Sequence, residues 1–299
     1  MTEALRLILV PLQKTKPQKQ DKKMPYKLIC LIFSFLCFSI SAQAVELCGK
    51  PVQGSILVGK APGATEVIFN QNHIPVKADG TFLLALGRDE AAHANLIVSN
   101  GTDARRYNFE VVPYAWDIQN IKGIPPRKVT PSDSDLRDIE FEQKVVRAAQ
   151  QTQSNNAYWK EGFIMPIEGR VSGNFGGQRI MNGVKKNPHA GMDIAAKAGS
   201  EVKAPAAGTV TLAQPDLFYS GNVVIVDHGY GLHTIYAHLQ KMNVKRGDTV
   251  KQGDIIGLVG QTGRATGPHL HWGASANGVK FNPPSLLNIN KSNDFCFIL

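Results

Sequence analysis

The chain has 299 residues, 43% of them hydrophobic, with 28 glycines and 17 prolines, which suits about two turn-rich globular domains and excludes a disordered chain. The formal net charge is +9 at pH 7, but residues 1–44 account for +5 of it. The remaining +4 forms no dense basic patch with interleaved aromatic residues, so we expect no nucleic-acid partner.

Residues 1–44 are typical of an upstream segment followed by an export signal. Lysines precede the apolar run Leu28–Ile40, and residues 42–44 have the small-x-small pattern of a signal-peptidase site. We expect cleavage after Ala44, a mature chain that starts at Val45, and no stable membrane insertion afterwards. The alternative is an uncleaved anchor, but the run is shorter than the roughly 20 residues of a spanning helix. Met24 would also serve as a start, so the true start codon stays open.

Two of the four cysteines, Cys30 and Cys37, would be removed with the apolar run. Cys48 and Cys296 remain, at opposite ends of the mature chain, in a compartment that permits disulfides. They fall in different predicted domains, so a Cys48–Cys296 bridge and two free thiols both stay open. Neither cysteine has the neighbours of a nucleophile.

Residues 45–115 consist of short apolar runs separated by turn residues, as in GSILVG, TEVIFN and ADGTFLLAL. This spacing predicts a small β-sandwich. Asp79-Gly80 and Asn100-Gly101 are typical of hairpin turns. His73 and His93 stand alone, and we expect both at the surface.

Residues 116–156 form a predicted linker, in which the paired prolines of IKGIPPRKV indicate an extended connector. A helix follows, with Thr130 as its cap and its end near Gln151. The helix is strongly polar, so we expect it on a domain surface or between the two domains. Its narrow apolar stripe comprises Ile139, Phe141, Val145 and Val146.

Residues 157–299 are rich in glycine and in strand-sized segments, which predicts an antiparallel β domain, so the fold class is mainly β. In GPHLHW, strand alternation puts His269 and His271 on one face and Leu270 on the other. Such a pair suits a metal ion, or a metal ligand beside an acid/base group. The alternative is a half-exposed strand that happens to carry two histidines.

Two further polar groups precede this pair. His189 and Asp193 have HxxxD spacing in NPHAGMDIAA, where a loop enters a strand. In TIYAHL, alternation puts His238 on the same strand face as Thr234 and Tyr236, and His233 on the other. Each motif alone occurs often by chance, and their joint presence in one domain favours a site. His228 and His233 are more typical of structural residues.

Together HAGMDIAA, VKAPAAGTV, IYAHL, VKRGDTVKQGDIIGLVGQTG, ATGPHLHW and NPPSLL resemble the lysostaphin-like, or LytM-type, zinc endopeptidases, which cut peptide bonds in bacterial peptidoglycan. The resemblance covers residues 163–287, and no motif position departs from it. It implies one zinc ion per chain, held by His189, Asp193 and His271. It also implies that His238 and His269 are the catalytic pair, without saying which is the general base.

The expected function is therefore that of an exported zinc metalloendopeptidase acting on peptidoglycan stem peptides and cross-links, in a Gram-negative periplasm. Three protein ligands leave a fourth zinc position for a water whose pKa can fall to about 7. No HExxH helix is present. Two other functions stay open: a non-catalytic activator of cell-wall amidases, which would lack ligands or catalytic histidines, and an envelope protein with purely structural zinc.

Two subsidiary hypotheses concern the surroundings of this site. Asn174 and Arg179, in GNFGGQR, are candidates for shaping the substrate groove. The N-terminal domain and linker hold no ligand cluster, and we hypothesise that they restrain the catalytic domain. The oligomeric state, the bond that is cut and the role of the first domain do not follow from the sequence.

Overall fold

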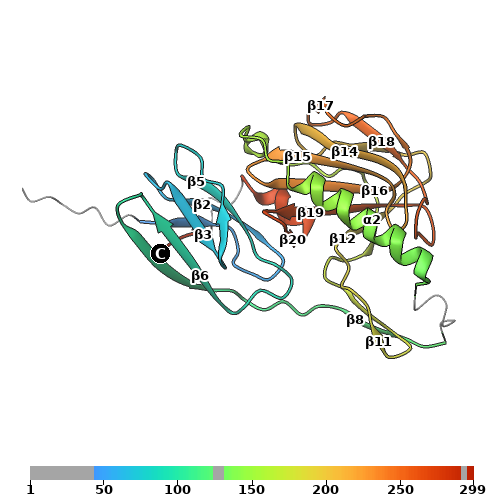
Figure 1. Cartoon of the computed structure of the whole chain (residues 1–299), viewed down its shortest axis with the longest axis horizontal. Coiled ribbons are helices and arrows are strands. Elements are labelled where there is room, and N and C mark those ends of the chain that lie inside the picture. The colour runs from blue at the N-terminus through green and yellow to red at the C-terminus, as the bar shows by residue number, and fades with distance from the viewer. Residues whose placement is uncertain (1–43, 124–130, 291–294) are drawn as a thin grey trace, which may run out of the picture. The chain divides into compact units, whose positions relative to one another are not determined.

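The computed structural model describes residues 44–123, 131–290 and 295–299, and their fold is mainly β, as the sequence predicts (Figure 1). The expected export signal and the paired prolines of the connector lie outside the described residues. Within those residues, no helix has both the length and the apolar character needed to cross a membrane.

Residues 45–112, whose strand spacing predicts a sandwich, form two four-stranded sheets together with the last strand of the chain. The first sheet has the order β21-β1-β2-β5, with β1 (Glu46–Cys48), β2 (Ile56–Lys60), β5 (Thr81–Ala85) and β21 (Cys296–Ile298). The second has the order β4-β3-β6-β7, with β3 (Glu66–Phe69), β4 (Asn72–Ile74), β6 (His93–Ser99) and β7 (Ala104–Glu110). Alternate residues of both sheets fill the core between them, among them Leu47, Leu57, Val67, Phe82, Leu96 and Phe109.

The turns of the sandwich agree with the sequence in one case and differ in the other. Asn100-Gly101 closes the β6–β7 hairpin, as expected. Asp79-Gly80 instead connects β4 to β5, which belong to opposite sheets, so the expected hairpin there is wrong. The β3–β4 hairpin turns at Asn70 and Gln71, whose φ values of 47° and 66° are in the left-handed region that hairpin turns require.

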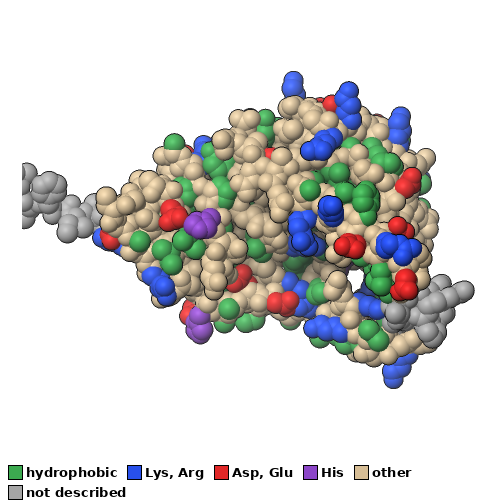
Figure 2. All heavy atoms as spheres, viewed as in Figure 1, with side chains coloured by type: hydrophobic (Ala, Val, Ile, Leu, Met, Phe, Trp, Pro, Cys, Tyr) green, Lys and Arg blue, Asp and Glu red, His purple; other side chains and the backbone are tan. Residues whose placement is uncertain are grey.

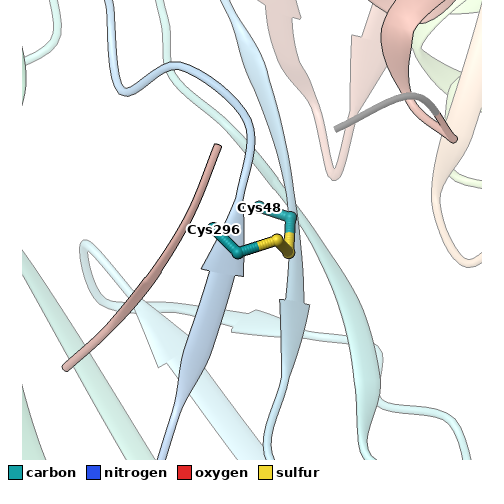
Figure 3. Close-up of a disulfide and its surroundings, with 2 residues drawn as sticks. All are labelled: Cys48 and Cys296. Carbon is teal, nitrogen blue, oxygen red and sulfur yellow. A yellow bond between two sulfur atoms is a disulfide. The ribbon is translucent and has the colours of Figure 1, made fainter. Parts of the chain in front are cut away.

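The last strand of the chain belongs to the sandwich. β21 pairs antiparallel with β1, and Cys48 and Cys296 face each other in that register. They form a disulfide across a sequence separation of 248 residues (Figure 3). The sequence left this pairing open and assigned all residues up to 299 to the second domain. A three-residue strand carries too little pattern to reveal that it returns to the first sheet.

The second half of the chain is built around one large sheet of order β17-β14-β15-β16-β19-β12-β9. The strands are β9 (Arg170–Gly173), β12 (Gly191–Ala195), β14 (Gly208–Leu217), β15 (Gly221–Gly229), β16 (Leu232–Met242), β17 (Thr249–Val250) and β19 (His269–Ala276). β13 (Glu201–Lys203), β18 (Ile255–Val259) and β20 (Val279–Phe281) attach to it, and η1 (Tyr158–Glu161) and η2 (Pro283–Asn288) are short helical turns. A separate sheet contains β8 (Ile118–Ile121), β10 (Gln178–Met181) and β11 (Val184–Lys185).

The long helix α2 (Asp133–Gln150) packs across β14 and β15 of the large sheet (Figure 1). Its cap is Ser132, in a capping box with Asp135, and not Thr130 as expected. The predicted apolar stripe of the helix is wrong at Phe141, which is 54% exposed. The side chains that reach the sheet from the helix include Val145, Val146 and Ala149, and they pack against Leu212, Leu217, Val223 and Ile225.

The sandwich and the large sheet share hydrophobic packing. In β5, Phe82 and Leu84 point into the sandwich core, whereas Leu83 and Ala85 belong to the core cluster of the large sheet. Side chains alternate along a strand, so β5 is buried on both faces. The sandwich is thus joined to the large sheet by an apolar contact as well as by the linker.

Charged side chains are dispersed over one face of the molecule. On the face shown in Figure 2, Lys and Arg side chains lie scattered among Asp and Glu side chains. The isolated histidines of the sandwich are exposed, as expected: His73 pairs with Glu66 and His93 with Glu110.

Candidate metal centre

Three side chains converge at one end of β12 and β19. His189 lies in the loop before β12, Asp193 lies within β12, and His271 lies opposite Asp193 on the antiparallel strand β19. His189 Nε2 is 3.1 Å from both Asp193 Oδ1 and His271 Nδ1, and these last two atoms are 2.9 Å apart. The structure thus brings together the three residues that the sequence named as metal ligands.

The three atoms fit a single small cation. A tetrahedral zinc ion with bonds of about 2.0–2.1 Å separates its ligand atoms by about 3.3 Å, close to the observed triangle. Two imidazoles and one carboxylate are also a donor set that zinc accepts. Among the described residues, this cluster offers three ligands and no fourth, which leaves room for a water or a substrate oxygen.

The backbone around the site orients His189. Its Nδ1 lies 2.9 Å from the Asn174 carbonyl oxygen, which can only accept, so Nδ1 carries the proton and Nε2 presents a lone pair to the site. The Gly176 amide donates to the His189 carbonyl, and Arg88 Nε of the sandwich donates to the Gly176 carbonyl. Asn174 therefore contributes its backbone to this site, and the sandwich touches the same loop.

Glycines allow the close approach of strands at the site. A Cβ at Gly173 would lie 2.6 Å from Asp193 Oδ2, and one at Gly191 would lie 2.8 Å from the ring of His271. Real Cβ atoms do not come so close to other heavy atoms. At these two positions, the close approach of the ligand side chains requires glycine.

The electrostatics of the cluster favour a cation. Burial by itself would raise the pKa of Asp193, but hydrogen bonds from His189 and His271 outweigh it and hold that pKa well below its ordinary value. Burial lowers the pKa of His271, and the bond to Asp193 offsets only part of this effect. Burial also opposes the charge on His189, but Asp193 more than compensates and raises its pKa. Asp193 is therefore ionised, and His271 loses its proton more readily than an ordinary histidine.

A second pair of histidines lies beside the ligands. The rings of His238 and His269 have centroids 4.7 Å apart, and His269 Nε2 is 3.8 Å from Asp193 Oδ1. In each ring Nδ1 donates to a backbone carbonyl, that of Thr262 for His238 and that of Gly267 for His269. Each neutral ring therefore keeps an unprotonated Nε2, as acid/base groups require.

The histidines of β19 obey strand alternation, whereas His238 does not. Leu270 is fully buried on the core side, and His271 and His269 lie on the opposite side, as predicted. In β16, the sequence predicts His238 on the face of Thr234 and Tyr236, but these two are buried in the core and hydrogen-bonded to each other. That prediction is wrong.

A β-bulge explains the difference. Asn222 of β15 pairs with Leu239 of β16, and Val224 pairs with Tyr236. Two residues along β15 therefore correspond to three along β16, so β16 has one extra residue beside His238. The φ of His238 is 62°, in the left-handed region that non-glycine residues rarely adopt. The bulge turns the imidazole away from the core and toward His269. Burial lowers the pKa of His238 to about 4, so the ring is neutral near pH 7.

The remaining histidines of this half are structural, as the sequence suggested. His228 is completely buried, with Nδ1 on the Ala207 carbonyl and Nε2 on the Thr234 hydroxyl. His233 is also buried, and its Nε2 donates to the Thr152 carbonyl at the end of the linker. Neither is among the side chains that converge on the metal cluster.

The sequence analysis missed the residues whose carbonyl groups hold the two rings, and it missed a buried carboxylate on α2. Thr262 and Gly267 act through carbonyl groups, which every residue has, so no residue-type signal could reveal them. Glu142 on α2 is different, because it is a buried carboxylate. Its spacing with Ile139, Val146 and Ala149 follows the period of a helix face, and that signal was available in the sequence.

Comparisons with known proteins converge on one family. Residues 187–283 match the model of peptidase family M23. The DD-carboxypeptidase/endopeptidase Mpg of Neisseria meningitidis is 45% identical over 98 residues, which are 33% of this chain and 22% of that protein. The peptidoglycan DD-endopeptidase ShyA of Vibrio cholerae is 38% identical over 135 residues, which are 43% of this chain and 31% of that protein.

A solved structure extends the likeness beyond the matched domain. A Pseudomonas aeruginosa protein assigned to peptidase M23 superposes with a TM-score of 0.64 at 29% identity, over 80% of this chain and 96% of that one. The two curated relatives are covered over less than a third of their own length. Their names describe whole proteins, of which the shared part is one domain.

Proposed function

We propose that the protein is a zinc metalloendopeptidase that hydrolyses peptide cross-links of bacterial peptidoglycan, because residues 187–283 match the model of peptidase family M23. The observation that carries the proposal is a three-ligand cluster beside two imidazoles whose Nδ1 atoms are held by backbone carbonyl groups. Relatives named for peptidoglycan DD-endopeptidase activity support the substrate class.

The metal ligands in this proposal are His189 Nε2, Asp193 Oδ1 and His271 Nδ1. Zinc bound there would supply Lewis acidity and a water of lowered pKa at the open fourth position. The carboxylate gives the donor set one negative charge, so the loaded site would keep a net charge of +1. The Asn174 carbonyl keeps His189 in the tautomer that a ligand needs.

His238 and His269 are the proposed proton-transfer residues. A neutral imidazole with a bare Nε2 can accept a proton from attacking water and pass it to the leaving amine. Once protonated, it can donate a hydrogen bond to the oxyanion formed from the scissile carbonyl. The backbone holds Nδ1 of both rings, so each presents Nε2 in a fixed direction, and the geometry suits either ring for either step.

The proposed place of action is outside the cytoplasm, where peptidoglycan lies, and we propose the periplasm of a Gram-negative bacterium. Residues 1–44 would direct export and be removed, with Val45 as the new N-terminus. Edman or mass-spectrometric sequencing of exported protein tests this step. An exported chain that retains Leu28–Ile40 would contradict it.

The decisive experiment is digestion of purified peptidoglycan by the mature protein, with and without a chelator, and identification of the fragments by mass. We expect cross-linked stem peptides to be split by the protein alone, and the chelator to stop the reaction until zinc is restored. The His189→Ala variant is the matched control for a contaminating hydrolase. If the zinc-loaded protein leaves cross-links intact but stimulates an added amidase, the activator function replaces the proposal. If it does neither, zinc is purely structural.

A further inference from the structure

Helix α2 places one carboxylate inside the protein. Glu142 is only 6% exposed and lies on the face of the helix that packs against the large sheet. Its Oε2 accepts a hydrogen bond of 2.7 Å from the Tyr219 amide. Its Oε1 accepts bonds from the Ser220 amide, at 3.1 Å, and from the Ser220 hydroxyl, at 2.6 Å. All three donors belong to the turn between β14 and β15.

This turn is the backbone support of His238. The Ser220 carbonyl accepts a hydrogen bond of 2.8 Å from the His238 amide. The Tyr219 carbonyl accepts a bond of 3.0 Å from the amide of Arg264, two residues after Thr262. Thr262 in turn accepts the His238 Nδ1 proton, so the turn reaches both the backbone and the ring of this histidine.

The packing at this point leaves little freedom. A Cβ at Gly221 would lie 2.3 Å from Thr262 Oγ1, and one at Gly263 would lie 2.4 Å from the Gly221 amide nitrogen. The turn and the loop that follows β18 are thus in direct backbone contact. His238 has a positive φ, which costs on the order of 1 kcal/mol or more and persists only when surrounding contacts impose it.

We propose that Glu142 is a positioning residue for His238. Helix α2 would then help to fix the orientation of a proposed catalytic side chain. The carboxylate fixes the β14–β15 turn, and the turn and the loop at Thr262 then hold the bulge that aims the imidazole at His269. The kinetic consequence rests on the proposed peptidase function, whereas the positioning itself does not. This role is opposite to the restraint that we hypothesised for the linker from the sequence.

The chemistry requires a carboxylate at this position. Three donors converge on it, and an ionised carboxylate has only acceptor atoms to offer. Gln at this position would keep one oxygen but turn an NH2 group toward a backbone amide. Ala would leave two amides and a hydroxyl without their buried acceptor, which the turn can relieve only by moving. Glu140, exposed on the same helix, provides a matched control.

The kinetic test uses the mature chain with zinc bound and a soluble cross-linked muropeptide as substrate. We expect Glu142→Ala to lower kcat by about 10- to 100-fold with little change in KM, because misplacing a catalytic group by about 1 Å has an effect of that order. Glu142→Gln should lose less, and Glu140→Ala should match the wild type. Zinc affinity, measured by competition with a chelator, should stay within about twofold in every variant.

A double-mutant cycle separates positioning from general loss of structure. If Glu142 acts through His238, Glu142→Ala has no further effect on kcat in a His238→Ala background. An equal loss in both backgrounds, an unchanged kcat in Glu142→Ala, or a loss of zinc affinity that accounts for the rate would each overturn the proposal. Should Glu142→Ala fail to fold, the same cycle with Glu142→Gln decides the matter.

A spectroscopic measurement tests the positioning without any activity. The Cε1–H resonance of His238 in the zinc-loaded protein is assigned as the signal missing from His238→Ala. We expect Glu142→Ala to shift or broaden it and Glu140→Ala to leave it in place. If the wild type splits no muropeptide but the resonance moves, the proposed function fails and the positioning stands. If the wild type is active and the resonance does not move, the positioning fails alone.

Discussion

Asp193 and His271 face each other directly across the antiparallel pair β12–β19, with Oδ1 and Nδ1 2.9 Å apart. Cross-strand neighbours in this register have fixed separations, so the sheet itself sets the distance between two of the three metal-ligand candidates. A shift of one residue would move one of them to the core face. The third candidate, His189, is then the ligand that a loop supplies.

The first prediction concerns the ligands. His271→Ala should lose zinc, because His189 and Asp193 would remain as a two-point site, and hydrolysis should fall to background. The measurement is zinc per chain after dialysis against metal-free buffer, together with the hydrolysis rate. His73→Ala, which changes an exposed histidine of the sandwich, is the control and should keep both values. Full zinc occupancy in His271→Ala would mean that the ligand assignment is wrong.

The second prediction separates ligands from acid/base residues. His269→Ala and His238→Ala should each keep zinc and lose on the order of 100- to 10,000-fold in rate, the usual cost of removing an acid/base group or an oxyanion donor. The same metal analysis and rate assay apply. Near-normal turnover in either variant, or loss of zinc from it, would contradict the roles proposed for this pair.

The third prediction concerns stability at low pH. Burial lowers the pKa of His228 to about 4, whereas the unfolded chain has a pKa of about 6.5 at this residue. The unfolded state therefore binds a proton first as the pH falls. The stabilising contribution is nearly complete at pH 7.5 and is lost progressively as the pH falls toward 4, by about 2 kcal/mol between pH 7.5 and 5.

His228→Asn tests this contribution, because Asn does not titrate and can still donate to the Ala207 carbonyl. We expect the variant to be less stable at pH 7.5 but to lose less of its free energy of unfolding between pH 7.5 and 5. Urea unfolding with excess chelator in every sample measures this and removes the effect of metal release. Equal losses in wild type and variant would show that His228 does not carry the pH dependence.

The fourth prediction concerns the disulfide. The Cys48–Cys296 bridge closes a loop with a sequence separation of 248 residues, so replacing both cysteines by serine should lower the free energy of unfolding by about 2–5 kcal/mol. Zinc content and the rate per folded molecule should not change, because the bridge lies in the sandwich. Thermal unfolding with and without reductant measures the effect. Reductant should destabilise the wild type and leave the double variant unchanged, and any other pattern would argue against the bridge.

The sequence, through its resemblance to the lysostaphin-like endopeptidases, named the three residues that gather in the candidate metal cluster. The motifs that contain these residues, HxxxD and HxH, are each short enough to be recognised from adjacent residues. Strand alternation along β19 also correctly placed Leu270 on the face opposite to the two histidines. Strand spacing also predicted the sandwich, because each strand of that domain is a short apolar run bounded by turn residues. Side-chain direction along a regular strand follows from backbone geometry alone, so these features need no knowledge of distant contacts.

The tertiary structure decided the rest. His238 reaches the site only because a bulge reverses the alternation, and the contacts that impose its positive φ come from residues before and after it in the chain. β21 joins the sandwich, and Glu142 finds its three hydrogen-bond donors, because distant segments complete their surroundings. The free energy of such pairings depends on which segments meet after folding, and no short stretch of sequence contains that information.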